Sequence, residues 1–210
     1  MFGPFFAENG FYVAIKGRLE GYSSTLRNRL LSKKLGVSPL YVGPDPYLRG
    51  LSHVHIGKNF SSGRGLWLQA VTEHAGEEFA PKIIIGEDVS ISFWTTIAAV
   101  NHVEIGSGVL IASKVIIVDH NHGYYGTEEH TSPRVPPAKR TLSRGRVVIG
   151  SNVWIGDGVV VGPGANIGEG CIIGSNSVVR GVIPAFTIAV GTPAKPIKRF
   201  DFDRMEWLRI

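Results

Sequence analysis

The chain has little sulfur and no long hydrophobic run. Its 210 residues include a single cysteine, Cys171, which excludes an intrachain disulfide framework and fits a reducing compartment. Pro4, Glu8 and Asn9 interrupt the phenylalanine-rich start, and no stretch approaches the roughly 20 apolar residues that a membrane span needs. We therefore expect a cytoplasmic protein with no secretory signal and no integral membrane segment.

Acidic residues are in the minority. The chain has 22 Lys and Arg against 17 Asp and Glu, a formal net charge of +5. A basic balance favours anionic partners such as nucleic acid, acidic lipid or phosphate-bearing small molecules. The basic residues cluster at 27–34, 134–146 and 195–199. No zinc-finger spacing or aromatic-interleaved basic stripe accompanies them, so binding of nucleic acid is not expected.

Glycine is abundant and part of it is periodic. The 27 glycines lack the three-residue period of collagen, which indicates that they serve turns. Aliphatic residues recur every sixth position at Ile149, Ile155, Val161, Ile167, Ile173 and Val179, with glycine next at 150, 156, 162, 168 and 174. Strand side chains two apart share a face, so positions one and five of each six point inward, and the glycine permits a sharp corner. Three such sides close into an 18-residue triangular coil, which predicts an all-β parallel β-helix.

The same lattice recurs upstream and is interrupted twice. It is present from 85 to 97 and from 105 to 117, and patternless polar loops break it at 73–82 and 123–146. We expect an N-terminal segment, 1–52, with a short amphipathic helix over 22–35. The β-helix follows over 53–192. A cap over 193–210, with a helix in its last ten residues, then covers the exposed strand edges.

The densest polar cluster is the run Asp119-His120-Asn121-His122, directly before the longer loop. Counting from Ile117 as position one places Asn121 at the inward corner, with His120 and His122 pointing outward. A solvent-accessible histidine can act as a general base, as transfer of an acyl group onto an alcohol requires. Its partner is expected to be Asp119 or a backbone carbonyl.

Counting in the same way from Ile97 places Asn101 inward and His102 beside it. His102 and His122 are then expected on adjacent coils at one corner. Three clustered histidines could instead bind zinc and leave a fourth position open for water. The sequence leaves both interpretations open.

Two tracts resemble a known family: VLIASKVIIVDHNHG at 109–123, and VVIGSNVWIGDGVVVGPGANIGEGCIIGSNSVVRGVIPAFTIAVGTPAKPIK at 147–198. They are similar to hexapeptide acyltransferases of the maltose, galactoside and nodulation O-acetyltransferase type, including bacterial enzymes that modify surface polysaccharides. The resemblance covers about 85–200. It implies a left-handed helix, a homotrimer with active sites between subunits, acetyl-CoA as donor and a sequential mechanism.

The resemblance also implies site residues. The family's catalytic histidine lies just before the long loop, which here is His122, with His120 as the second choice. The acetyl-CoA site is expected at Trp154, Asp157, Ser175, Arg180, Lys195 and Lys198, and no metal is required. A cation at the 3′-phosphate of CoA would use part of the positive charge.

The residues with which the family binds its acceptor are matched less completely in this sequence. Relatives that acetylate simple sugars carry asparagine where Ser92 aligns and aspartate where Ala99 aligns, so a small sugar is not expected. Ser92 and His102 stay candidates for the acceptor site. Tyr124 and Tyr125 in the long loop, with the arginines at 134 and 140, could bind a larger and anionic glycan.

Four functions remain open at this point. The first is O-acetylation of a sugar or a surface-polysaccharide precursor, and the second is N-acetylation of an amino sugar. The third is a zinc site like that of γ-class carbonic anhydrases, although that family typically spaces two histidines five apart, unlike His120 and His122. The fourth is a trimeric scaffold without catalysis.

Overall fold

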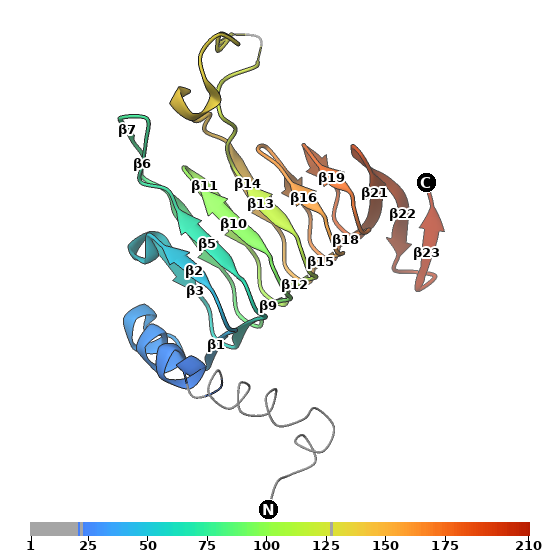
Figure 1. Cartoon of the computed structure of the whole chain (residues 1–210). Helices are drawn as coiled ribbons and strands as arrows, with labels where there is room; N and C mark the ends of the chain where they lie inside the picture. Colours follow the sequence, from blue (N-terminus) through green and yellow to red (C-terminus); the bar gives the residue numbers. More distant parts are fainter. Residues whose placement is uncertain (1–20, 22, 127) are drawn as a thin grey trace, which may run out of the picture.

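The chain coils into a three-sided prism of parallel strands (Figure 1). A computed structural model describes residues 21, 23–126 and 128–210. The first face has nine strands in the order β1-β4-β9-β12-β15-β18-β21-β22-β23. These are β1 (Leu40–Val42), β4 (Phe60–Ser62), β9 (Ser90–Ile91), β12 (Leu110–Ile111), β15 (Trp154–Ile155), β18 (Ile172–Ile173), β21 (Thr187–Gly191), β22 (Ala194–Asp201) and β23 (Glu206–Arg209).

The other two faces have six strands each. The second face contains β2 (Tyr47–Arg49), β5 (Trp67–Ala70), β10 (Thr96–Ala99), β13 (Ile116–Val118), β16 (Val160–Val161) and β19 (Val178–Val179). The third contains β3 (Val54–Ile56), β8 (Lys82–Ile85), β11 (His102–Ile105), β14 (Arg146–Ile149), β17 (Asn166–Ile167) and β20 (Val182–Ile183). The first corner joins the first face to the second, and the second corner joins the second face to the third. Two 3₁₀ turns, η1 (Leu51–His53) and η2 (Pro137–Lys139), lie outside the faces.

The inward face of the lattice is as the repeat predicts. All six aliphatic residues of the repeat between 149 and 179 are at most 1% exposed, and they line one continuous core. The residues four positions later are also buried: Val153, Val159, Ala165, Cys171 and Ser177. The thiol of Cys171 donates to the carbonyl of Pro184, and burial raises its pKa. Cys171 is therefore a core residue.

The glycine that follows each inward aliphatic residue has another role than the one predicted. At Gly156, a Cβ would lie 2.7 Å from the backbone nitrogen of Ser175 on the next coil. The left-handed conformation of that corner falls two residues later, on Gly158, with φ of 67°. Glycine at this place in the repeat therefore allows successive coils to approach closely, and the turn itself is made elsewhere.

The β-helix begins earlier than predicted. β1 pairs with β4 and β2 pairs with β5, both in parallel, so the first coil starts at Leu40 rather than at residue 53. Val42 and Leu48 stand six residues apart and Gly43 follows Val42, but the next lattice position, Ile56, comes eight residues after Leu48. Counting back in sixes from Ile56 therefore misses them. The predicted helix is confirmed over 23–35 and ends at Gly36, which has a positive φ; residues 1–20 and Tyr22 lie outside the described residues. Within the described chain, no helix has the length and apolar character needed to cross a membrane.

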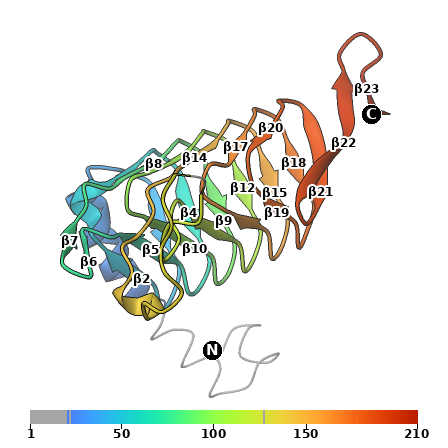
Figure 2. The same ribbon diagram turned by 90° about the horizontal axis from the view of Figure 1, so that it is seen from above.

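The C-terminal end is a hairpin, and the predicted capping helix is wrong. β22 pairs antiparallel with β21, and β23 pairs antiparallel with β22 (Figure 2). The edge of β21 would otherwise present unpaired backbone groups, which an added strand satisfies and a helix would not. Aromatic contacts among Phe186, Phe200, Phe202 and Trp207 hold the hairpin together.

Coil stacking can be tested at one glycine. We expect Gly156→Ala to destabilise the protein by about 1–3 kcal/mol, because the new methyl group meets backbone that must shift. The matched control is Gly162→Ala, where the nearest atoms would lie 3.7 Å or more from the new Cβ. Thermal unfolding of both variants checks this, and equal melting temperatures for the two would contradict it.

Candidate active site

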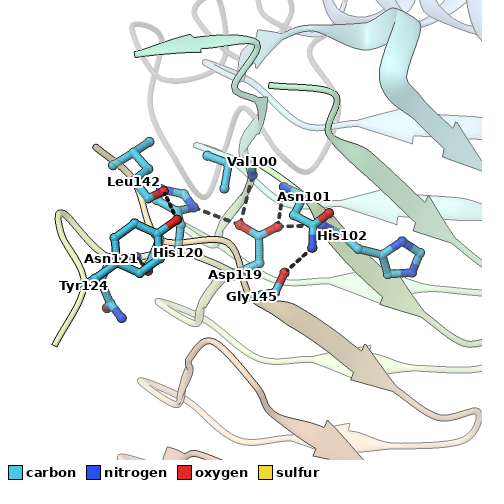
Figure 3. Close-up of polar contacts among 10 residues, drawn as sticks. Val100, Asn101, His102, Asp119, His120, Asn121, Tyr124, Leu142 and Gly145 are labelled. Atoms are coloured by element: carbon cyan, nitrogen blue, oxygen red, sulfur yellow. Dashed lines mark hydrogen bonds and ion pairs between the residues drawn. The ribbon is translucent and has the colours of Figure 1, made fainter. Parts of the chain in front are cut away.

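A buried carboxylate occupies the second corner of the prism. Asp119 follows β13 and is fully buried. The backbone N–H of Val100 donates to its Oδ1 at 2.9 Å, and the N–H groups of Asn101 and His102 donate to its Oδ2 at 2.8 and 2.7 Å (Figure 3). These three donors belong to the coil below, at the same corner. The position of the carboxylate is thus set by the backbone of the β-helix.

His120 uses the remaining capacity of that carboxylate. Its Nδ1 lies 2.9 Å from Oδ1 of Asp119, and its side chain is 13% exposed. A proton on Nδ1 satisfies this contact and leaves the lone pair on Nε2. Nε2 has no hydrogen-bond partner among the described residues. His120 therefore has the arrangement of an oriented general base: a carboxylate behind the ring and a free nitrogen in front.

His122 is placed differently. It is exposed, its Nδ1 lies 3.3 Å from the carbonyl oxygen of Pro137, and its ring meets His74 edge to face with centroids 5.1 Å apart. A carboxylate does not hold it. The geometry thus favours His120 over His122, the reverse of the order that the family resemblance implied.

Two positions assigned by counting are wrong. Asn121 and Asn101 are exposed, whereas both were expected to point inward. The buried residue at this corner is Asp119, because the chain leaves the lattice there, two residues before the expected position. Asn101 instead anchors the returning chain, since its Nδ2 donates to the carbonyl of Gly145 at 2.7 Å.

His102 does not lie with His122. Its strand neighbour on the next coil is Arg146, and its ring lies on the opposite side of Asp119 from His120 (Figure 3). His102 Nε2 and Arg146 both contact Oε2 of Glu104, at 3.0 and 3.1 Å. The hydrogen bond from His102, followed by that from Arg146, lowers the pKa of Glu104. His102 therefore belongs to a charged cluster on the third face.

A short antiparallel ladder forms the base of the long loop. The N–H and carbonyl of Asn121 bond with the hydroxyl and N–H of Ser143, both at 2.9 Å, and Gly145 N–H donates to the carbonyl of Asp119 at 2.7 Å. His122 is bridged to Leu142. His120 is thus held between the ladder and the coil beneath it.

The second insertion, at the same corner, clasps this ladder. The hairpin of β6 (Glu73–His74) and β7 (Glu77–Glu78) projects on the same side of the prism as the long loop (Figure 1). Glu77 accepts hydrogen bonds from the hydroxyl of Thr141 and from Arg144, the latter at 2.5 Å. These bonds, the first from Thr141, lower the pKa of Glu77. No local pattern predicts this contact, because the segment around Glu77 has no periodicity.

An apolar cluster lies under the clasp. Phe79, Val100 and Leu142 are buried together, with Val71 packed against them, and Arg144 lies over the ring of Phe79 at 5.0 Å. These side chains come from three different coils, so the two insertions close over the corner of the coil between them. The cluster supports the ladder that carries His120.

The two loop tyrosines serve the loop itself. Tyr124 is half-buried, with its hydroxyl 3.5 Å from the carbonyl of Leu142. The Tyr125 hydroxyl donates to the carbonyl of His122 at 2.5 Å and accepts from Arg140 at 2.7 Å. Arg140 also donates to the carbonyls of Val135 and Pro133. Tyr125 is nevertheless 61% exposed, so its ring stays accessible.

The residues expected to bind the donor are spread over the prism. Trp154 lies on the first face, 50% exposed, between Leu110 and Ile172 of the neighbouring strands. Asp157 and Ser175 follow at the first corner, where Oδ1 of Asp157 accepts from the N–H of Ser113 at 2.9 Å. Ser92 stands at this corner too, on a lower coil. The structure thus brings Ser92, expected to bind the acceptor sugar, to the same corner as Asp157 and Ser175, which were expected to bind acetyl-CoA.

Three cations complete the expected set. Arg180 follows β19 at the second corner, and its side chain lies over Gly162 of the coil below. Lys195 and Lys198 lie on β22, opposite Val190 and Ile188. Over the described residues, no three His, Cys, Asp or Glu side chains form a group that could hold a metal ion.

Comparisons with known proteins identify the family of the chain. Residues 146–181 match the family model described as bacterial transferase hexapeptide (six repeats). WbbJ of Escherichia coli K12, which is named as an O-acetyltransferase of lipopolysaccharide biosynthesis, is 42% identical over 77% of this chain and 79% of its own. The chain belongs to the hexapeptide-repeat acyltransferase family. It is an acetyltransferase of the sugar and polysaccharide type.

A further relative and two solved structures are similar to the chain in sequence or in fold. Rv3034c of Mycobacterium tuberculosis, named as an acetyltransferase, is 35% identical over 69% of this chain, which spans 42% of that protein's length. Among solved structures, the Bacillus cereus N-acyltransferase AntD is 20% identical with a TM-score of 0.63, covering 84% of this chain and 90% of its own. A hexapeptide-repeat acetyltransferase of Vibrio cholerae, VCA0836, is 20% identical with a TM-score of 0.51, covering 89% of each chain. The predicted fold, a left-handed parallel β-helix, is confirmed.

The clasp predicts a pH-dependent loop. The contacts of Glu77 lower its pKa in the folded protein from the ordinary value of 4.5, so they stabilise the docked loop above that value and are lost as the pH falls below it. We expect Glu77→Gln to speed amide exchange of residues 140–144 at neutral pH by roughly two- to fivefold, the size typical of an exposed ion pair. Hydrogen–deuterium exchange, corrected for intrinsic rates, measures this.

The control for that measurement is Glu78→Gln on the same hairpin, where the side chain is exposed. It should leave the exchange of residues 140–144 unchanged. Wild-type exchange should rise towards that of Glu77→Gln as the pH falls below 4.5. If both variants behave alike at neutral pH, Glu77 does not hold the loop.

Proposed function

We propose that the protein transfers the acetyl group of acetyl-CoA to a hydroxyl of a sugar in a surface-polysaccharide precursor, with His120 as general base. The observation that carries the proposal is the Asp119–His120 pair, with Nδ1 held at 2.9 Å and Nε2 directed away from the carboxylate. The kinship with WbbJ, whose name specifies O-acetylation in lipopolysaccharide biosynthesis, supports the substrate class. Use of acetyl-CoA places the reaction in the cytoplasm.

The reaction is a direct acyl transfer. Nε2 of His120 accepts the proton of the sugar hydroxyl as its oxygen attacks the thioester carbonyl carbon. The C–S bond then breaks, and the proton on Nε2 passes to the departing CoA sulfur. Asp119 stabilises the imidazolium that exists between these two proton transfers and keeps the ring in one orientation. No metal is needed for these steps.

We propose that donor and acceptor bind between copies of the chain in a homotrimer. His120 lies at the second corner, whereas Trp154, Asp157 and Ser175 lie on the first face or the first corner. The second face separates the two corners, so a neighbouring copy is required to bring these groups to one site. That face carries a row of exposed apolar side chains suited to contact between copies: Tyr47 (39%), Trp67 (42%) and Ile116 (40%).

The donor site follows from the same arrangement. We place the adenine and pantetheine of acetyl-CoA along the exposed side chains of the first face around Trp154, with Asp157 and Ser175 at its edge. Lys195 and Lys198 on β22 of the same face supply cations for the phosphates, and Arg180, at the second corner, would contribute from a neighbouring copy. The structure of AntD, similar in fold, was determined with 3-hydroxybutyryl-CoA and with CoA, which supports a thioester donor on such a prism.

The acceptor site is proposed at Ser92 and at the loop tyrosines 124 and 125. Phe93 and Trp94 follow Ser92 at the first corner and are 55% exposed each, so their rings can pack against the apolar face of a sugar. AntD is named as an N-acyltransferase, and an amine acceptor would use the same base. An acceptor screen should therefore include both hydroxyl and amino sugars, scored by mass for one added acetyl group.

His120 and His122 can be separated by substitution. We expect His120→Ala to lower kcat by about 10²- to 10⁴-fold, because the proton then has no acceptor. His122→Ala should stay within about fivefold of wild type, since among the described residues this side chain has one hydrogen bond, to a backbone carbonyl, and one ring contact, with His74. Thiol release from acetyl-CoA in the presence of acceptor measures both, and the reverse order would restore His122 as the base.

The shared site predicts complementation. His120→Ala and Trp154→Ala should each be inactive alone. Chains of both kinds, unfolded and reassembled together in equal amounts, should regain about one quarter of wild-type activity, because one interface in four then combines an intact His120 with an intact Trp154. If both residues act within a single chain, the mixture stays inactive. Reassembly of wild-type chain alone gives the reference value.

A further inference from the structure

The helix over 23–35 has two faces, and only the inward one is needed by the fold. Asn28 is buried, and its Oδ1 accepts from the N–H of Val42 at 3.0 Å. Arg27 donates to the carbonyls of Val42 and Gly43 at 2.6 and 2.8 Å. Leu31 and Leu35 pack against the core of the prism. These contacts fix the helix to the first coil.

The outward face combines leucines with cations. Its residues follow the spacing of a single helical stripe: Leu26, Arg29, Leu30, Lys33 and Lys34. All five are exposed, with Leu26 at 56% and Leu30 at 62%. An open groove of about 380 Å³ runs along this side, lined by Leu26, Leu30 and Leu31 with basic side chains at its edges. We call these five residues the basic leucine stripe.

The basic leucine stripe does not contribute to packing of the helix on the prism. Both leucines lie away from the coil to which the helix is attached, and Arg29, Lys33 and Lys34 form no ion pair with any acidic side chain in the described part of the chain. The helix lies beside β1 at the N-terminal end of the prism, and the β22–β23 hairpin lies at the other end (Figures 1 and 2). The stripe is therefore a surface of its own, separate from the clasp and from the expected donor residues.

We infer that the basic leucine stripe docks the protein onto the surface of an anionic lipid bilayer. Leucines on one side of a surface helix enter the boundary between headgroups and acyl chains, and neighbouring Lys and Arg attract the lipid phosphates. A polysaccharide precursor carried on a lipid would then meet the enzyme at the membrane. The docking itself is independent of acyl transfer and of the proposed base.

Charge distinguishes this occupant from the alternatives. A symmetric contact between two copies through this stripe would place the cations of one copy against those of the other. Residues 1–20 contain two acidic side chains, Glu8 and Glu20, and two basic ones, Lys16 and Arg18, so they offer no net negative charge. A layer of anionic headgroups matches both the leucines and the three cations.

Vesicle binding by the full chain tests the inference. We expect the wild type to cosediment with vesicles of phosphatidylcholine containing about 30% phosphatidylglycerol, and to bind pure phosphatidylcholine at least about tenfold more weakly. Raising the salt from about 0.1 M to about 0.5 M should weaken the binding. Leu26→Ser/Leu30→Ser and Lys33→Glu/Lys34→Glu should each lower the partition coefficient about tenfold.

Two matched variants control for hydrophobicity and charge. Met205→Ser/Ile210→Ser removes two apolar side chains that are 72% exposed each at the C-terminal end, and Lys58→Glu/Lys82→Glu reverses two exposed lysines on other parts of the prism. Both should bind vesicles as the wild type does. Because every substituted side chain is exposed, each variant is expected to fold. Circular dichroism checks this for each one.

Three results would overturn the inference. The first is that the wild type does not bind anionic vesicles. This result would also follow if residues 1–20 covered the stripe. The second is stripe variants that bind as tightly as the controls. The third is a change of oligomeric mass in the stripe variants, measured by light scattering, which would assign the stripe to contact between copies. None of these measurements depends on acetyl transfer, so a failure of the proposed activity leaves them interpretable.

Discussion

Every coil of the prism is held by the next one, because backbone N–H groups along each face donate to carbonyls one coil further on. At the second corner this exchange is interrupted, since the chain leaves the lattice at Asp119 and returns only at Arg146. The amides of residues 100–102 then bond with a side chain, the carboxylate of Asp119, instead of a carbonyl. The interaction that closes the lattice therefore also orients His120, so the proposed base is held by the stacked coils.

The regular part of the fold was predictable because a backbone constraint produces the repeat. Close stacking of the coils favours a small residue at positions such as Gly156, and a filled interior favours aliphatic side chains such as Ile155. Most six-residue units repeat both preferences, so the register can be followed from the spacing. The first coil was missed because eight residues rather than six separate Leu48 from Ile56, so counting in sixes from Ile56 does not reach Val42 and Leu48.

The candidate site was predictable only as a neighbourhood. Counting by six beyond Val118 assumes that the lattice continues, and the error at Asn121 arises because it does not. The choice between His120 and His122 depends on contacts with residues 100–102 and with Pro137, which are distant in sequence. The clasp through Glu77 joins segments more than sixty residues apart, so no local pattern could reveal it. At the C-terminal end, the unpaired backbone groups along the edge of β21 are satisfied by an added strand, and this pairing was not visible in the local sequence of the last ten residues.

A prism with a filled core cannot enclose a substrate, so its chemistry must lie on the outside. The outer surface of this chain divides the proposed functional groups between two corners: the proposed base, His120, lies at one, and the aromatic and polar side chains proposed for acetyl-CoA and the sugar lie at the other or on the first face. The rigidity that fixes each group also prevents a single chain from folding one corner onto the other. On the proposed mechanism a complete site therefore requires assembly, and the second face, with its exposed apolar side chains between the two corners, is the surface that we propose for contact between copies.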